Sequence, residues 1–134
     1  MAAVMETGPA VAPDAQWVDV CPRELLMPEL GVCAQVGAFA VAVFHLPDAE
    51  PQLFAVGNID PFNAASVLSR GIVGDLKGEW VVASPLHKHH FSLTKGVCLE
   101  DPRVRIPVFA VRVAEGMIQV ADRPISHGAD ERGR

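Results

Sequence analysis

Cysteine is scarce in this sequence. The three cysteines are Cys21, Cys33 and Cys98, and no two of them form a CxxC pair. An odd number without short spacing argues against a disulfide framework and against a zinc knuckle. Residues 1–16 contain no basic residue and do not resemble a secretory signal. These features predict a cytoplasmic protein whose cysteines are small, buried apolar residues.

Positive charge and long apolar runs are scarce as well. The 134 residues hold 11 Lys and Arg against 16 Asp and Glu, a formal net charge of -5. A nucleic-acid binder needs a basic face to neutralise phosphates, so we expect no nucleic-acid partner. The longest apolar stretch, Ala38–Phe44, is far shorter than the roughly 20 residues of a membrane-spanning helix, so we expect no membrane insertion either.

Apolar material for a single core is abundant. Half of the residues are hydrophobic, and the length suits one domain. Residues 1–15 are rich in Ala, Pro and Gly, and residues 121–134 are polar with Pro and Gly. Neither segment has a hydrophobic period, so we expect two flexible tails around a folded body at residues 16–120.

Short β-strands dominate the pattern of this body. Runs of β-branched and aromatic residues alternate with turn signals such as Lys77-Gly78 and Glu115-Gly116, and Pro22 precedes a single helical turn. We therefore predict an all-β fold, either a sandwich or a small barrel. The expected strands are Trp17–Val20, Val32–Val36, Phe39–Leu46, Gln52–Val56, Gly71–Leu76, Glu79–Ala83, Phe91–Leu93, Val97–Leu99, Val104–Val113 and Met117–Val120.

One segment in the middle of the chain, Asp60–Leu68, favours a helix. Asp60 would accept a hydrogen bond from a free N–H at the helix start, and Pro61 would occupy the first turn. Capping accounts for Asp60 without any chemistry.

The most prominent chemical cluster is a group of histidines. His87, His89 and His90 lie within four positions, and neutral imidazole binds zinc, copper and iron. No second group of ligands completes a four-ligand site, so we favour a solvated loop, and a His-rich metal-binding module stays open as an alternative. The sequence contains neither a nucleophile elbow nor a phosphate-binding glycine pattern, so we predict no catalytic residue.

Several longer strings carry a family resemblance. They are Ala55–Phe62 with its Asn-Ile-Asp-Pro-Phe, Ser66–Gly71, Val82–Leu86, Phe91–Leu93 and Gly96–Asp101, preceded by Trp17, Cys21 and Gly31–Ala34. Over essentially Trp17–Val120 the chain resembles the small subunits of assimilatory NAD(P)H-dependent nitrite reductase. The longer N-terminal tail departs from typical members of that family.

The resemblance implies a Rieske-like fold, which is all-β and carries a small loop subdomain with one or two short helical turns. A Rieske [2Fe–2S] centre holds one iron by two Cys and the other by two His. The CxH positions of the family fall on Asp60 and Phe62, and the CxxH positions fall on Ser84 and His87. Three of the four ligands are absent, so we expect no cluster and no other metal in this chain. Asp60 would cap its helical turn, Phe62 would fill apolar space, Ser84 with Pro85 would shape the second loop, and His87 would lie at the surface.

The resemblance also implies a function. This chain would be a non-catalytic accessory subunit of a cytoplasmic complex that reduces nitrite to ammonium with NAD(P)H in nitrate assimilation. The partner large subunit would carry FAD, an iron–sulfur cluster and sirohaem. A Rieske-type electron-transfer protein is the further alternative. The expected interface with the large subunit consists of Asn58, Asp60, Pro61, Phe62, Leu68, Ser69, Arg70, Ser84, Pro85 and His87.

Overall fold

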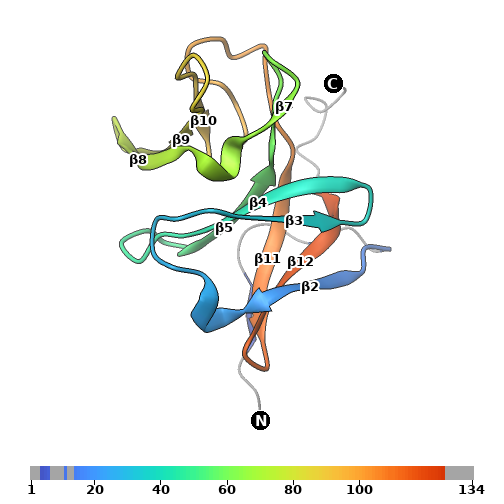
Figure 1. Ribbon diagram of the computed structural model, residues 1–134. Coiled ribbons are helices and arrows are strands. Elements are labelled where there is room, and N and C mark those ends of the chain that lie inside the picture. The colour runs from blue at the N-terminus through green and yellow to red at the C-terminus, as the bar shows by residue number, and fades with distance from the viewer. Residues whose placement is uncertain (1–3, 7–10, 12–13, 126–134) are drawn as a thin grey trace.

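Two antiparallel sheets and a short strand pair build the fold (Figure 1). This computed structural model describes residues 4–6, 11 and 14–125. The large sheet has the order β2 (Trp17–Pro22), β12 (Met117–Pro124), β11 (Val108–Ala114), β5 (Leu53–Gly57), β4 (Phe39–His45) and β3 (Val32–Val36), with β1 (Val4–Glu6) also paired to β11. The small sheet has the order β10 (His90–Ser92), β9 (Glu79–Ala83) and β8 (Ile72–Leu76), and β6 (Ile59–Asp60) pairs with β7 (Ala65–Ser66).

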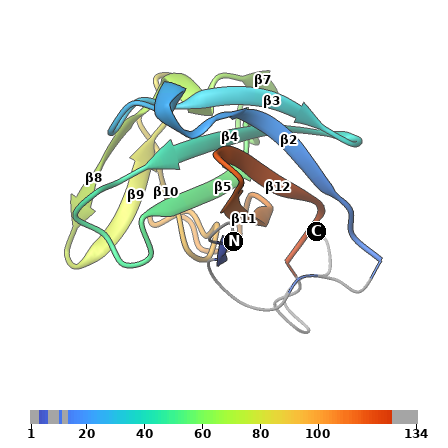
Figure 2. The same ribbon diagram turned by 90° about the horizontal axis from the view of Figure 1, so that it is seen from below.

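The large sheet nearly closes into a barrel. The two strands at the ends of its order, β2 and β3, approach each other, and the small sheet lies to one side of it (Figure 2). Helical structure in the described residues is limited to two 3₁₀ turns, η1 (Arg23–Leu25) and η2 (Leu68–Arg70). The expected all-β fold is confirmed, and of the two expected forms, sandwich and partly open barrel, the structure has the barrel. The expected helical turn after Pro22 is confirmed as well.

The two central strands, β4 and β5, are buried on both faces. Val41 and Val43 of β4 pack into the core inside the large sheet. Ala42 and Phe44 point the other way, into the core shared with the small sheet. Successive side chains of a strand alternate between faces, so a strand buried on both faces is a continuous apolar run. That is why residues 39–44 of this strand are uniformly apolar.

Tight turns join two of the strand pairs. Lys77 and Gly78 connect β8 to β9 with φ values of +55° and +84°, and Glu115 and Gly116 connect β11 to β12 with φ values of +53° and +80°. Two-residue hairpin loops with both residues at positive φ match the twist of the flanking strands. Both turns expected from the sequence are therefore confirmed.

The expected helix over Asp60–Leu68 is wrong. Residues 60–68 contain the end of β6, a turn, and β7, and only then the 3₁₀ turn η2. The Asp60 carboxylate does cap a main-chain N–H, that of Phe62 at 2.9 Å, but it closes a turn rather than a helix. Asp favours both local arrangements, so propensity alone does not separate them.

The ends of the folded body also differ from the expected ones. β12 continues to Pro124, past the expected end at residue 120, and Ile125 is buried. β1 pairs with β11 inside the expected N-terminal tail. The rest of the two expected tails, residues 1–3, 7–10, 12–13 and 126–134, lies outside the described residues.

Candidate functional site

Two loops meet beside the small sheet. The first loop comprises residues 58–71, and the second loop comprises residues 84–89. The Ser84 hydroxyl of the second loop donates a 2.6 Å hydrogen bond to Oδ2 of Asp60 in the first. Both side chains are buried, and the same hydroxyl accepts a bond from the Leu86 N–H. Asp60 and Ser84, which stand at the two expected cysteine positions, thus hold the loops together.

Asn58 organises the inner part of the first loop. Its amide nitrogen donates to the Ser66 hydroxyl at 2.7 Å, and its amide oxygen accepts from the Ser69 N–H at 2.6 Å. Its main-chain oxygen accepts from the N–H groups of Val67 and Leu68. A buried amide with its donor and acceptor both used fixes the path of a loop that has little regular structure. Asn58 is therefore a scaffold of the first loop.

Phe62 does not fill the core as expected. Its side chain is 38% exposed and stacks on the His89 ring of the second loop, with centroids 3.9 Å apart. Phe91, 6.3 Å from Phe62, takes the fully buried place beneath them. Among the described residues, the buried His89 Nδ1 has no hydrogen-bond partner. The two loops therefore present an aromatic pair at the surface.

The residues expected to form the interface fall into a buried group and an exposed group. Asn58, Asp60, Leu68 and Ser84 are buried, Ser69 is partly buried, and Pro61, Phe62, Arg70, Pro85 and His87 are exposed. His87 and Lys88 form the tip of the second loop with φ values of +49° and +58°. The exposed residues are the ones that another protein could reach.

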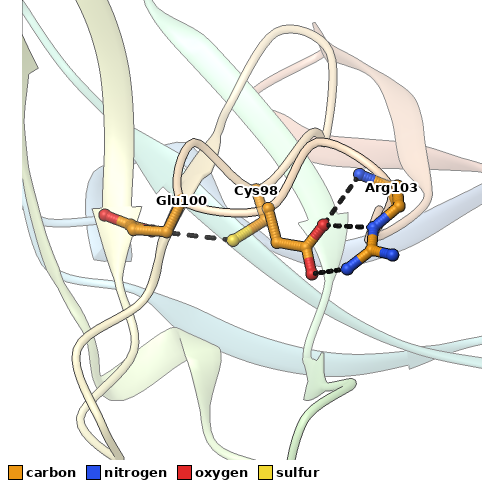
Figure 3. Close-up of polar contacts among 4 residues, drawn as sticks. Cys98, Glu100 and Arg103 are labelled. Carbon is orange, nitrogen blue, oxygen red and sulfur yellow. Dashed lines mark hydrogen bonds and ion pairs between the residues drawn. The ribbon is translucent and has the colours of Figure 1, made fainter.

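A third segment, Cys98–Arg103, lies against His90 at the start of β10, next to the second loop. Figure 3 shows the polar contacts within this segment. The Glu100 carboxylate accepts from the His90 main-chain N–H at 2.8 Å and pairs with His90 Nδ1 at 2.6 Å. Burial works to raise the pKa of Glu100, but the hydrogen bonds from His90 outweigh it and hold that pKa below its ordinary value. Two hydrogen bonds join the Arg103 guanidinium to Asp101 and lower the Asp101 pKa. The sequence carries no local signal for the His90–Glu100 pair, because the two residues are ten positions apart.

The three cysteines differ in exposure. Cys98 is buried and its thiol approaches Glu100 Oε1 at 3.6 Å, and burial raises its pKa. Cys21 is partly buried, and Cys33 is exposed beside the Asn58 amide at 3.3 Å. The expectation of buried cysteines is wrong for Cys33, because alternate residues of β3 face outward.

The residues at the four Rieske positions do not fit a [2Fe–2S] cluster. Such a centre needs two thiolates and two imidazoles. Asp60 and Ser84 offer hard oxygen atoms that are already joined by a hydrogen bond, and Phe62 offers no ligand atom. Of the four, His87 alone keeps a ligand of the type that a Rieske centre uses.

The histidines are not brought together as a metal site. His89 stacks on Phe62, His90 pairs with Glu100, and His87 projects from the loop tip. Across the described ranges, no three His, Cys, Asp or Glu side chains form a group that could hold a metal ion. The described part of the chain also has no helix long and apolar enough to cross a membrane.

Comparisons with known proteins agree on one family. The family model for a Rieske-like [2Fe-2S] domain matches residues 16–121. The nitrite reductase (NADH) small subunit of Escherichia coli K12 is 44% identical over 106 residues, which cover 79% of this chain and 97% of the relative. The solution structure of the E. coli protein NirD superposes with a TM-score of 0.72 at 43% identity, over 80% of this chain and 96% of that one.

A second type of relative is much longer. The nitrite reductase [NAD(P)H] large subunit of Klebsiella oxytoca contains a stretch 30% identical to this chain over 118 residues. The match covers 88% of this chain but only 12% of the Klebsiella protein. One polypeptide there combines a segment like this chain with a large-subunit sequence.

Proposed function

The chain belongs to the family of nitrite reductase (NADH) small subunits with a Rieske-like domain, and from this membership we propose that it is the accessory subunit of a cytoplasmic complex that reduces nitrite to ammonium with NAD(P)H. The observation that carries the proposal is the identity of 44% over 97% of the length of a small subunit. Identity that spans the whole relative covers the loops as well as the barrel.

The partner is the nitrite reductase large subunit. The Klebsiella large subunit supports this, because a segment homologous to this chain is covalently part of it. Two sequences that are joined in one protein and separate in another are expected to associate when separate. We propose that FAD, the iron–sulfur cluster and sirohaem belong to that partner, which performs the chemistry.

We propose further that this chain carries no cluster of its own. The side chains at the four ligand positions support this: they are a carboxylate, a phenyl ring, a hydroxyl and one imidazole. The hydroxyl and the carboxylate are hydrogen-bonded to each other. Oxygen donors are poor ligands for an iron–sulfide cluster, which prefers thiolate. The small subunit then contributes binding rather than electron storage.

The interface consists of the exposed part of the two loops. Pro61, Phe62, Arg70, Pro85 and His87 would contact the large subunit. The buried Asn58, Asp60, Leu68 and Ser84, with the partly buried Ser69, would hold them in place through the hydrogen bonds described above. Exposed aromatic and arginine side chains are enriched among residues that dominate binding energy, so Phe62 and Arg70 are the strongest candidates.

A tagged chain recovered from cells grown on nitrate tests the proposal. We expect a large co-purifying protein with the absorption bands of sirohaem and NAD(P)H-dependent nitrite reduction to ammonium in the eluate. Phe62→Ala combined with Arg70→Glu should release the large protein. Leu25→Ala combined with Arg123→Glu is the matched control, because both side chains are exposed on other elements and should leave assembly intact.

The purified chain alone tests the absence of a cluster. Iron and acid-labile sulfide should both be far below one equivalent after expression in iron-replete cells. Stoichiometric iron and sulfide would contradict this and support a Rieske-type electron carrier. A solitary, inactive chain in the nitrate-grown eluate would contradict the accessory-subunit proposal itself.

A further inference from the structure

The small sheet ends in a strand with an open edge. In the order β10-β9-β8, the described chain places no strand beyond β8, and Figures 1 and 2 both show β8 at the outer margin of the molecule. Ile72, at the start of β8, is 75% exposed. An exposed edge strand with an apolar residue on it is a ready template for another extended segment.

The register identifies which main-chain groups face outward. Leu76 pairs with Glu79 across the two-residue turn, and Gly74 pairs with Val81. In such a hairpin the pair that closes the turn is hydrogen-bonded, and alternate pairs follow it. The N–H and C=O groups of the intervening residues, Val73 and Asp75, therefore point away from β9, toward the open edge.

A groove begins at Leu76, the end of β8 opposite to Ile72. It has a volume of about 470 Å³, and its apolar lining includes Leu76, Val97, Leu99 and Pro102. Leu76, Glu79 and Ser92 all line it, and their register puts them on one face of the small sheet. A strand added along β8 would direct alternate side chains to this face and into the groove.

The rim of the groove is positive although the chain is negative. Lys77 and Lys95 line it, whereas the net charge of the chain is -5. One acidic residue, Glu79, also lines it, and its carboxylate already accepts from the hydroxyls of Ser92 and Thr94. Asp75 on β8 likewise uses its carboxylate on the Gly78 N–H, at 2.8 Å.

We infer that β8 and this groove bind an extended segment of the large subunit that adds a strand to the small sheet, inserts an apolar side chain and directs a carboxylate to Lys77 and Lys95. Main-chain bonds to Val73 and Asp75 would supply affinity, and the groove and the lysines would supply specificity. This inference rests on the proposed function, because it takes the large subunit as the partner. It adds a second contact, distinct from the two loops.

The test measures the affinity of the purified full-length chain for the purified large subunit. Asp75→Pro removes an outward N–H that β9 does not use, and the ring blocks an added strand. Asp75→Ala is its matched control, because it loses the same carboxylate but keeps the N–H. Lys77→Glu with Lys95→Glu tests the rim, and Arg123→Glu, on β12, controls for a charge reversal elsewhere on the surface.

We expect Asp75→Pro and the double lysine variant each to bind about tenfold more weakly, and both controls to stay within about twofold of the unaltered chain. Circular dichroism checks folding, and the lysine variant decides the question if Asp75→Pro does not fold. Unaltered affinity of the β8 variants, with affinity lost in Phe62→Ala/Arg70→Glu, would overturn this inference and leave the proposed function standing. A dimer of this chain that only the β8 variants dissociate would overturn it too. No binding by the unaltered chain would overturn both.

Discussion

The Ser84 hydroxyl and the Asp60 carboxylate form a buried hydrogen bond of 2.6 Å that joins the two loops. The residues are 24 positions apart, and each also bonds a main-chain N–H of its own loop. A buried carboxylate depends on every donor around it, because burial removes the water that would otherwise solvate it. This pair therefore supports the shape of both loops.

Ser84→Ala should lower the free energy of unfolding by about 1–3 kcal/mol, the usual cost of leaving a buried hydrogen-bonding group without its partner. Urea unfolding followed by circular dichroism measures it. Ser69→Ala is the control, because Ser69 bonds Asn58 through its main-chain N–H, which the substitution keeps. Equal stability of both variants would contradict the role given to the Ser84 hydroxyl.

The barrel could be predicted from the sequence because its signals are local. The apolar runs of β4 and β5 and the glycine turns at Gly78 and Gly116 each specify their own conformation. These signals need no knowledge of distant residues.

The loops could not be predicted in the same way. Asp60 reads as a helix cap in isolation, and the bond to Ser84 that fixes its actual place comes from another loop. His90 reads as one of three histidines, whereas its partner Glu100 is ten residues on. Long-range pairs of this kind leave no periodic pattern.

Truncation of two aromatic residues of the site should lower stability by very different amounts. Phe91→Ala removes a fully buried ring and should cost about 3–5 kcal/mol of unfolding free energy. Phe62→Ala removes a ring that is partly in solvent and stacked on His89, and should cost about 1 kcal/mol or less. Urea unfolding of both variants tests this. A large loss for Phe62→Ala would show that the ring is part of the core and not free for a partner.

Glu100→Gln should make stability less dependent on pH in acid. The folded pKa of Glu100 is below its ordinary value of 4.5, so the unfolded chain binds the proton more readily. The contribution of Glu100 to the free energy of unfolding is thus fully present above pH 4.5 and is lost as the pH falls through the lowered folded pKa. The measurement is the unfolding free energy at pH 7 and at about pH 3.5, and the difference should shrink in the variant.

His90→Ala refines that experiment, because it removes the ring donor but keeps the main-chain N–H that also bonds Glu100. We expect a pH dependence between those of the unaltered chain and Glu100→Gln. A dependence in Glu100→Gln equal to that of the unaltered chain would show that other carboxyl groups govern the acid response.

Restoring the missing ligands tests whether these loops still occupy the place of a Rieske centre. Asp60→Cys, Phe62→His and Ser84→Cys together with the native His87 would supply two thiolates and two imidazoles. The side chains of residues 60 and 84 already touch, so two thiolates there face each other across the loops. We expect reconstitution with iron and sulfide to give a reducible [2Fe–2S] signal in electron paramagnetic resonance only in the triple variant. The double variant that keeps Phe62 has one imidazole and should give none. A signal from the unaltered chain would contradict the proposed absence of a cluster, and a folded triple variant without one would contradict the assignment of these four positions.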